Sequence, residues 1–308
     1  MQQTFALIIP IFIVIAMGWI AVRRKFVDPI GSAALNGFAY WVALPSLLLG
    51  STVTMDTNGL IDVAGIYLGC CVAVYACAVT LGALILKRTV VQAAMFGLNS
   101  TYGNISYFGA PLVSAAFGLQ ALPVPLAIIA LQSAVLLPLT AILVEIGSRS
   151  QGSIRTVVHN TALNLLKNPI IMSLLIGIAW RTTGLDLPLP VHNLLTLLGN
   201  AAAPLALFCL GAALPTAATK SVISPEVILA VIIKLIILPT GVGIIAAEAG
   251  LSGLSWRVVV LTAAVPTAAN AILLARPETR FSEASANIVV LATSLSAVTV
   301  TAILSWVR

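Results

Sequence analysis

Polar side chains gather in one short stretch of an otherwise apolar chain. Seven of the nine residues from 99 to 107 are polar, and Gly103, Gly109 and Pro111 lie among or just after them. Polar groups left without partners in an apolar environment cost several kcal/mol, and glycine and proline interrupt a helix. Unwound backbone at membrane depth persists only where it is buried in protein or lines a cavity. The predicted ligand-binding residues in this stretch are Asn99, Asn104, Tyr107 and Pro111.

A second interrupted stretch covers residues 263–270 and contains Pro266 and Asn270, which are also predicted site residues. Asn104 and Asn270 each lie about 12–14 residues into an apolar segment, which is near the middle of a helix that crosses a bilayer with about 20 residues. We therefore expect the two interruptions to lie at similar depths.

Lys234 is a cation inside an apolar segment, with Glu226 and Glu248 only near the ends of that segment. A charge at the bilayer centre costs about 2.5–3.5 kcal/mol on insertion scales and faces the interior of a helix bundle. Its ammonium could attract a substrate carboxylate, or supply positive charge where related sodium-coupled folds hold a cation. It could equally satisfy carbonyl groups freed by the break near Pro266, and the sequence leaves these alternatives open.

Composition excludes several classes of protein. Sixty per cent of the residues are hydrophobic and 8% are charged, whereas soluble domains carry about 25% charged residues. The mean hydropathy is +1.11. The net charge of +6 comes from short clusters rather than a basic stripe, so nucleic acid is not expected as a partner. Four cysteines inside apolar segments, none in a CxxC pattern, and two distant histidines predict neither a metal site nor a cofactor.

These features predict an all-α polytopic membrane protein. Ten segments are long and apolar enough to cross a bilayer. They cover approximately residues 5–22, 32–51, 62–86, 92–117, 123–147, 166–183, 193–214, 225–247, 256–277 and 284–307.

The basic residues predict an orientation. With ten spans, eleven lysines and arginines fall on one side and three on the other, with Lys234 inside a span. Basic loops are retained in the cytoplasm. We therefore expect an integral plasma (inner) membrane protein with both termini extracytoplasmic.

An offset of 159 residues aligns the chain with itself. Pro45 aligns with Pro204, Gly18 with Gly177 and Gly82 with Gly241. The unit contains five spans, an odd number, so the second copy must be inverted. The predicted parts are a first repeat over 1–148, a cytoplasmic linker over 149–165 and a second repeat over 166–308. Inverted repeats with interrupted helices, here spans four and nine, are typical of secondary transporters. A duplicated structural protein is the alternative.

Four short motifs resemble the auxin efflux carrier family in its compact bacterial form, and the resemblance covers essentially the whole chain. They are Gly103-Asn104 with Gly109-Ala110-Pro111-Leu112, Asn168-Pro169, Ala203 to Phe208 with Gly211, and Pro266 with Asn270. The resemblance implies ten helices in two inverted repeats, a crossover of spans four and nine, and a homodimer. It also implies small organic anions as substrates, such as malonate or related carboxylates in bacterial members, and a substrate contact for Gln132.

The expected function is a secondary carrier that moves a small organic anion by alternating access, without coupling to a second ion. A channel-like anion pathway is one alternative. An intramembrane enzyme is the other, but the sequence has no HExxH motif, no central acidic pair and no deep histidine.

Overall fold

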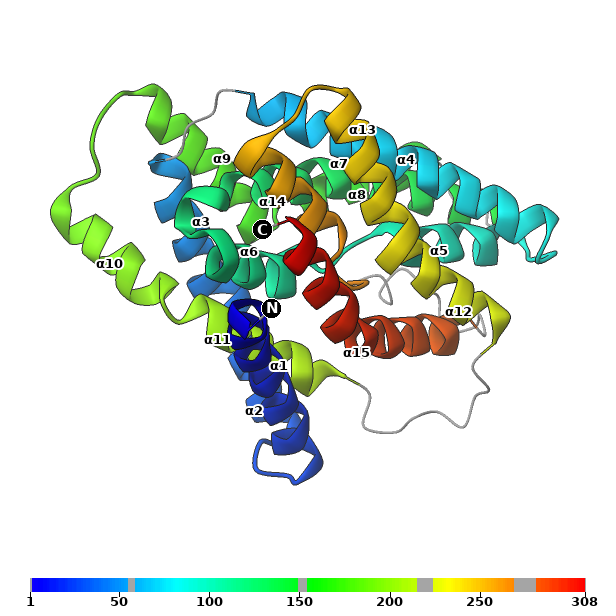
Figure 1. Ribbon diagram of the computed structural model, residues 1–308, viewed down its shortest axis with the longest axis horizontal. Coiled ribbons are helices and arrows are strands. Elements are labelled where there is room, and N and C mark those ends of the chain that lie inside the picture. Colours follow the sequence, from blue (N-terminus) through cyan, green and yellow to red (C-terminus); the bar gives the residue numbers. More distant parts are fainter. Residues whose placement is uncertain (1, 55–58, 149–153, 215–223, 269–280, 308) are drawn as a thin grey trace.

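The computed structural model describes residues 2–54, 59–148, 154–214, 224–268 and 281–307. Within these ranges the chain is almost entirely helical, and its one β feature is an isolated bridge (Figure 1). The helices that extend over ten or more residues are α1 (Gln2–Arg23), α2 (Pro29–Phe38), α3 (Leu44–Val53), α4 (Leu60–Leu84), α5 (Val90–Thr101), α7 (Pro123–Gly147), α8 (Ile154–Leu166), α9 (Pro169–Thr182), α10 (Leu189–Gly199), α11 (Ala202–Ala213), α13 (Leu238–Glu248), α14 (Gly253–Ala263) and α15 (Phe281–Val307). The shorter elements are α6 (Ala110–Phe117), α12 (Pro225–Ile232), η1 (Ala39–Ala43), η2 (Ile105–Gly109), η3 (Leu119–Ala121) and η4 (Ile233–Ile237).

Seven helical segments of the described chain are long and apolar enough to cross a membrane. They are Thr4–Arg23, Pro29–Val53, Leu60–Leu84, Leu119–Gly147, Leu189–Ala213, Pro225–Glu248 and Glu283–Val307. An eighth span results if α8 and α9, which are bent by 63° against each other, are counted as one. The two remaining predicted spans, four and nine, correspond to shorter helices with interruptions. The structure therefore confirms an all-α polytopic membrane protein.

Three of the long segments widen into a π-helical turn just before a proline. The turns η1, η2 and η4 end two residues before Pro45, Pro111 and Pro239, respectively. Each turn is closed by a bond from a backbone N–H to the carbonyl five residues earlier, as from Leu238 to Ile233. A proline ring removes one N–H and collides with the carbonyl four residues before it. The wider turn accommodates that ring without ending the helix.

The helices form two groups by their mutual contacts. The α1 group comprises α1, α2, α3, α9, α10 and α11, whereas the α4 group comprises α4 to α8 and α12 to α15, together with η2 and η4. In Figure 1, α1 and α2 extend toward the bottom while α4, α5 and α12 extend to the right, so the groups diverge on that side. They meet mainly where α1 and α11 contact η2, α6 and α15.

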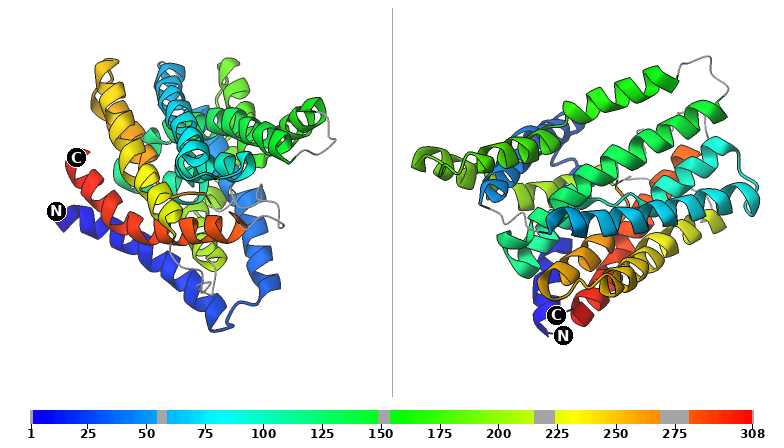
Figure 2. Two further views of the ribbon diagram at one scale, coloured as in Figure 1. Left: turned by 90° about the vertical axis from the view of Figure 1, so that its right-hand side faces the viewer. Right: turned by 90° about the horizontal axis from the view of Figure 1, so that it is seen from above.

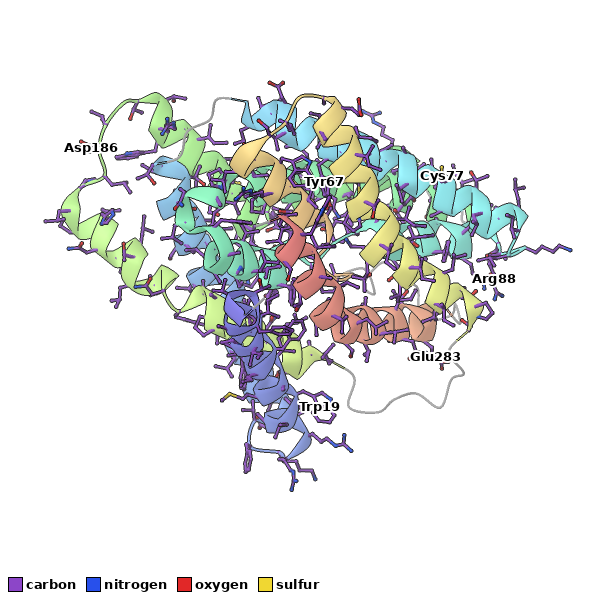
Figure 3. The ribbon with its side chains drawn as sticks, in the orientation of Figure 1. Trp19, Tyr67, Cys77, Arg88, Asp186 and Glu283 are labelled. Atoms are coloured by element: carbon purple, nitrogen blue, oxygen red, sulfur yellow. The ribbon has the colours of Figure 1, made fainter. Side chains whose placement is uncertain are left out.

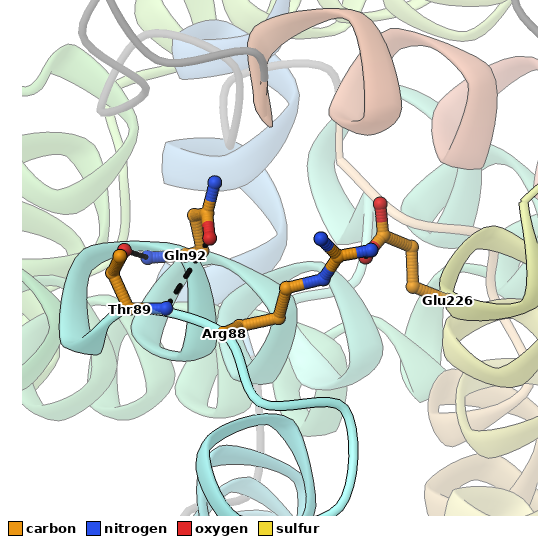
Figure 4. Close-up of polar contacts among 4 residues, drawn as sticks. All are labelled: Arg88, Thr89, Gln92 and Glu226. Atoms are coloured by element: carbon orange, nitrogen blue, oxygen red, sulfur yellow. Dashed lines mark hydrogen bonds and ion pairs between the residues drawn. The ribbon is translucent and has the colours of Figure 1, made fainter.

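Polar contacts at the diverging end hold the α4 group together. Thr89 caps α5 in a capping box with Gln92, and Arg88 forms an ion pair with Glu226 of α12 across 2.6 Å (Figure 4). Figure 3 shows the charged residues Arg88, Asp186 and Glu283 at the periphery, whereas Tyr67 lies within the bundle. This distribution is the one expected for a chain whose middle layer faces lipid.

The segment predicted as a linker, 149–165, is largely helix α8, which packs against α7. Asn168 caps α9 immediately after it, and Pro169 takes the first helical position. The bend between α8 and α9 therefore joins the two helix groups. The beginning of α1 and the end of α15 lie close together in both views of Figure 2, and the two helices contact each other.

Close helix contacts in the α1 group depend on glycine. A Cβ on Gly18 of α1 would lie 2.0 Å from the carbonyl oxygen of Phe208, and one on Gly211 of α11 would lie 1.8 Å from that of Ile15. A Cβ on Gly177 of α9 would lie 2.6 Å from Cβ of Thr52 in α3. Small residues at such positions let the backbones of membrane helices approach closely.

We predict that Gly18→Ala destabilises the protein by about 1–3 kcal/mol, because the added methyl group can be accommodated only by moving backbone. The measurement is the thermal melting of the purified protein in detergent. Gly65→Ala is the matched control, since a Cβ on this glycine of α4 meets nothing within 4 Å. Equal melting temperatures of the two variants would contradict the α1–α11 packing.

Candidate functional site

Two interrupted helices meet in the middle of the molecule and pair through their backbones. Helix α5 ends at Thr101, and Gly103 forms an antiparallel bridge with Thr267, four residues beyond the end of α14. The N–H of Asn104 donates to the Pro266 carbonyl at 2.8 Å, and the N–H of Ala268 donates to the Tyr102 carbonyl at 3.0 Å. We call residues 102–104 and 266–268 the crossing.

Side chains reinforce the crossing. The hydroxyl of Thr267 donates to the Asn99 carbonyl at 2.8 Å. The side-chain amide of Asn99 donates to the Met95 carbonyl at 2.8 Å and to Oγ of Ser285 in α15 at 3.0 Å. All of these side chains are buried. Asn99 therefore connects α5 to α15 behind the crossing.

Gly103 is required by the close packing at the crossing. A Cβ at this position would lie 2.7 Å from Cγ2 of Val265 and 3.4 Å from Nζ of Lys234. Real Cβ atoms do not approach a neighbour as closely as the first of these distances. Glycine at this position therefore lets residues 102–104 lie directly against the second interrupted segment.

A new helical segment starts directly after the crossing. Asn104 precedes η2, and its Oδ1 accepts the backbone N–H of Tyr107 at 3.4 Å. The segment continues through α6 to Phe117. The unpaired N–H groups at a helix start carry positive partial charge and favour anions. This segment thus presents its positive end at the crossing.

A cavity of about 670 Å³ leads to this helix start from the diverging side of the two groups. It extends from Val22 and Pro29 to Asn104 and Tyr107. The hydroxyl of Tyr107 donates to Oδ1 of Asn36 in α2 at 2.9 Å, so one hydrogen bond connects the two helix groups beside the cavity. The volume is within the usual range for small-molecule sites.

A second space of about 40 Å³ lies next to the crossing. Tyr40, Tyr102, Asn104, Ser133 and Asn168 line it, and the Tyr102 hydroxyl pairs with Oγ of Ser133 at 2.9 Å. Among the described residues, none that lines this space or the larger cavity is charged. A ligand here would therefore contact amides, hydroxyls and backbone dipoles.

A third cavity, of about 490 Å³, opens at the other end of the same interface. Its polar lining residues include Ser46, Gln120, His192, Asn200 and Ser255. It shares no lining residue with the other two cavities. A layer of buried apolar side chains separates the two ends; it includes Leu44, Leu48, Ala110, Leu122, Ile170 and Ala206.

The structure brings some of the predicted site residues together. Asn104 and Tyr107 line the large cavity, and the Pro266 carbonyl accepts a hydrogen bond at the crossing. Asn99 lies behind the crossing, and Pro111 is buried in α6. These last two line none of the three cavities.

Gln132 and Lys234 also lie away from the cavity lining. Gln132 is buried in α7, where its Oε1 accepts from the hydroxyl of Tyr67 at 3.3 Å while its Nε2 has no partner. Lys234 is buried in η4 and donates from Nζ to the Ala263 carbonyl at 2.7 Å. Asn270 lies outside the described residues, so its predicted role stays a prediction.

Several lining residues were not predicted from the sequence. Asn36 and Tyr40 reach the cavities from α2 and η1 as single polar residues in an apolar stretch, and Ser133 reaches the smaller space from α7, directly after Gln132. The position of Asn168 at a helix start could have been predicted from the sequence, since an asparagine before a proline is typical of a helix start. Its position directly after α8 puts it at the joint between the two groups.

Seven or eight apolar spans in the described chain, two interrupted helices that pair at a crossing, and a cavity that reaches this crossing define a class: polytopic membrane proteins that transport solutes. Residues 4–304 match the model of the family described as "Membrane transport protein". The chain therefore belongs to this family, of auxin efflux carrier type, and the resemblance inferred from the motifs is confirmed. A relative from Rhizobium meliloti (strain 1021), named "Putative malonate transporter", is 29% identical over 314 residues, which cover all of this chain and 97% of the relative.

The cavity makes a prediction about cysteine reactivity. Cys70, Cys71 and Cys209 are all buried, but Cys209 lines the 670 Å³ cavity, whereas the other two line none of the three cavities. We expect a small water-soluble thiol reagent to label Cys209 of the purified protein faster than Cys70 or Cys71, as measured by mass spectrometry of peptides. Cys209→Ser is the control, and equal labelling of the three thiols would contradict a water-accessible cavity.

Proposed function

We propose that the chain is a secondary carrier that moves a small organic anion, a carboxylate such as malonate or a related acid, across the cell membrane. The observation that carries this proposal is the uncharged cavity of about 670 Å³ that ends at the start of η2. The name of the Rhizobium relative and the membership in a transport family support it.

The chemistry of the cavity suits a carboxylate that must bind and leave again. The side-chain amide of Asn104, at the positive end of the helix, can donate hydrogen bonds to its oxygens, and the hydroxyl of Tyr107 can do so when it releases Oδ1 of Asn36. Fixed cations would bind a dianion tightly and slow its release, whereas neutral donors and a helix dipole bind it moderately. Asn36 and Tyr40 supply a further amide and a further hydroxyl group from the α1 group, and Asn168 supplies an amide from the bend between α8 and α9.

We further propose alternating access between the two helix groups. The large cavity reaches the crossing from one end, and the apolar layer around Leu44 and Leu122 separates it from the 490 Å³ cavity at the other end. Movement of the α4 group against the α1 group would close the first cavity and connect the second. The Tyr107–Asn36 hydrogen bond and the bend at Asn168-Pro169 both join the groups and would change in that movement.

We infer ten spans in two inverted repeats, residues 1–148 and 166–308, from a symmetry in the glycine contacts. Gly18 and Gly177 are equivalent at the offset of 159, and so are Leu49 and Phe208. Gly18 of α1 approaches Phe208, and Gly177 of α9 approaches Leu49 and Thr52. Equivalent residues thus make reciprocal contacts, as a two-fold axis between inverted repeats requires. We also propose a homodimer in the plasma (inner) membrane, on the basis of the family.

Transport is tested with the protein reconstituted into liposomes. Malonate inside the vesicles should accelerate uptake of labelled malonate, because a carrier returns faster when it is loaded, whereas a channel shows no such counterflow. We expect Asn104→Ala to reduce the uptake roughly 5- to 100-fold, since hydrogen bonds to a charged group are lost. Asn164→Ala, on the exposed face of α8, is the matched control. Wild-type counterflow in the Asn104 variant would remove this residue from the site.

The same vesicles test coupling. A bare anion moves with the membrane potential, which contributes about 2.3 kcal/mol per charge per 100 mV. We expect an imposed potential to drive malonate flux in the absence of sodium and proton gradients. Flux that requires either gradient would contradict the uncoupled mechanism.

The orientation is tested by labelling single cysteines in intact cells. A cysteine placed near residue 152 should react only with reagents that reach the cytoplasm, and one near residue 187 only with reagents outside. The reason is the excess of basic residues on the side that contains residue 152, because basic loops are retained in the cytoplasm. The reverse pattern would place both termini in the cytoplasm.

A further inference from the structure

Lys234 is buried at the point where the two interrupted helices end. It lies in η4, in the middle of the segment Pro225–Glu248, and its side chain is fully buried. Its Nζ donates at 2.7 Å to the carbonyl of Ala263, the last residue of α14. The same nitrogen lies 3.4 Å from where a Cβ on Gly103 would be, two residues beyond the end of α5.

The ends of α5 and α14 create a place that favours positive charge. The last carbonyl groups of a helix have no partner within it, and they carry a negative partial charge. Two such ends converge here in a buried environment, where that charge is poorly screened. In secondary transporters, C-terminal ends of half-helices and unwound carbonyls hold a bound cation.

No acidic side chain of the described residues forms an ion pair with Lys234, in contrast to Arg88 with Glu226. The thiol of Cys71, which donates to the Thr101 carbonyl at the end of α5, also interacts electrostatically with it. Lys234 lines none of the three cavities, so an anion in them would not touch its ammonium. Its position therefore fits neither an ion pair with an acidic side chain nor direct contact with substrate.

We propose that Lys234 is a built-in counter-cation, which occupies the cation site formed by the ends of α5 and α14. It neutralises the two helix ends permanently, so the crossing needs no dissolved cation to be stable. The consequence of this role for transport rests on the proposed function. The carrier functions without a coupling cation because the side chain of Lys234 already occupies the position that such a cation would take.

The proposal is tested by measuring thermal stability with two substitutions of Lys234. One leaves the space of the lysine side chain empty, and the other fills it. Lys234→Ala removes the ammonium and the stem, and leaves room for a small cation among the carbonyl groups. Lys234→Met removes the charge but fills the space with an apolar stem of similar length. Lys25→Ala, at an exposed lysine after α1, is the control.

We expect both Lys234 variants to melt below the wild type in choline chloride. Replacing choline with sodium at equal ionic strength should raise the melting temperature of Lys234→Ala saturably, by on the order of 5 °C. Sodium should not affect Lys234→Met, the wild type or Lys25→Ala. In liposomes, malonate flux by Lys234→Ala should then become dependent on sodium.

Three outcomes would overturn the proposal. They are equal stabilisation of the wild type by sodium, a Lys234→Ala variant as stable as the wild type in choline, and a destabilised variant that sodium does not restore. If Lys234→Ala cannot be purified, Lys234→Ser takes its place, because it leaves a similar space. The melting experiment contains no malonate, so its failure is independent of whether malonate is transported.

Discussion

The need to pair every backbone polar group inside a membrane governs this structure. Each interrupted helix frees N–H and carbonyl groups at a depth where water cannot satisfy them, at a cost of several kcal/mol per group. The chain meets this need by pairing the two interruptions with each other, through Asn104 to Pro266 and Ala268 to Tyr102. Each break therefore supplies hydrogen-bond partners to the other.

The crossing also separates opposite charges. The ends of α5 and α14 face Lys234 on one side, whereas the start of η2 faces the large cavity on the other. Unwinding one helix thus produces a place for a cation and a place for an anion only a few residues apart. The cation in the first of these places is a side chain of the protein itself, Lys234. The positive partial charge at the start of η2 therefore remains available to a ligand.

The sequence allowed the breaks to be predicted but not their partners. Gly103, Pro111 and Pro266 mark interruption by their own geometry, and Asn104 was polar enough at that depth to indicate a site. Pairing between residues 102–104 and 266–268 depends on how the helices pack, which no local pattern encodes. For the same reason the sequence did not reveal that Asn99 hydrogen-bonds to Ser285 and Gln132 to Tyr67, and their predicted contact with ligand stays a prediction. Residues 149–165 were predicted as a linker because their polarity hid the helical packing of α8 on α7.

The packing within each helix group differs from the packing between the groups in the way that the proposed alternating access requires. Gly18 and Gly211 bring the backbones of α1 and α11 into direct contact, so the α1 group resists internal sliding. The α4 group is held by the crossing, by Lys234 and by Arg88–Glu226. Between the groups lie cavities, an apolar layer and, beside the large cavity, the hydrogen bond from Tyr107 to Asn36. Apolar contacts can be exchanged for similar ones at little cost, so displacement between the groups is the change that the packing opposes least.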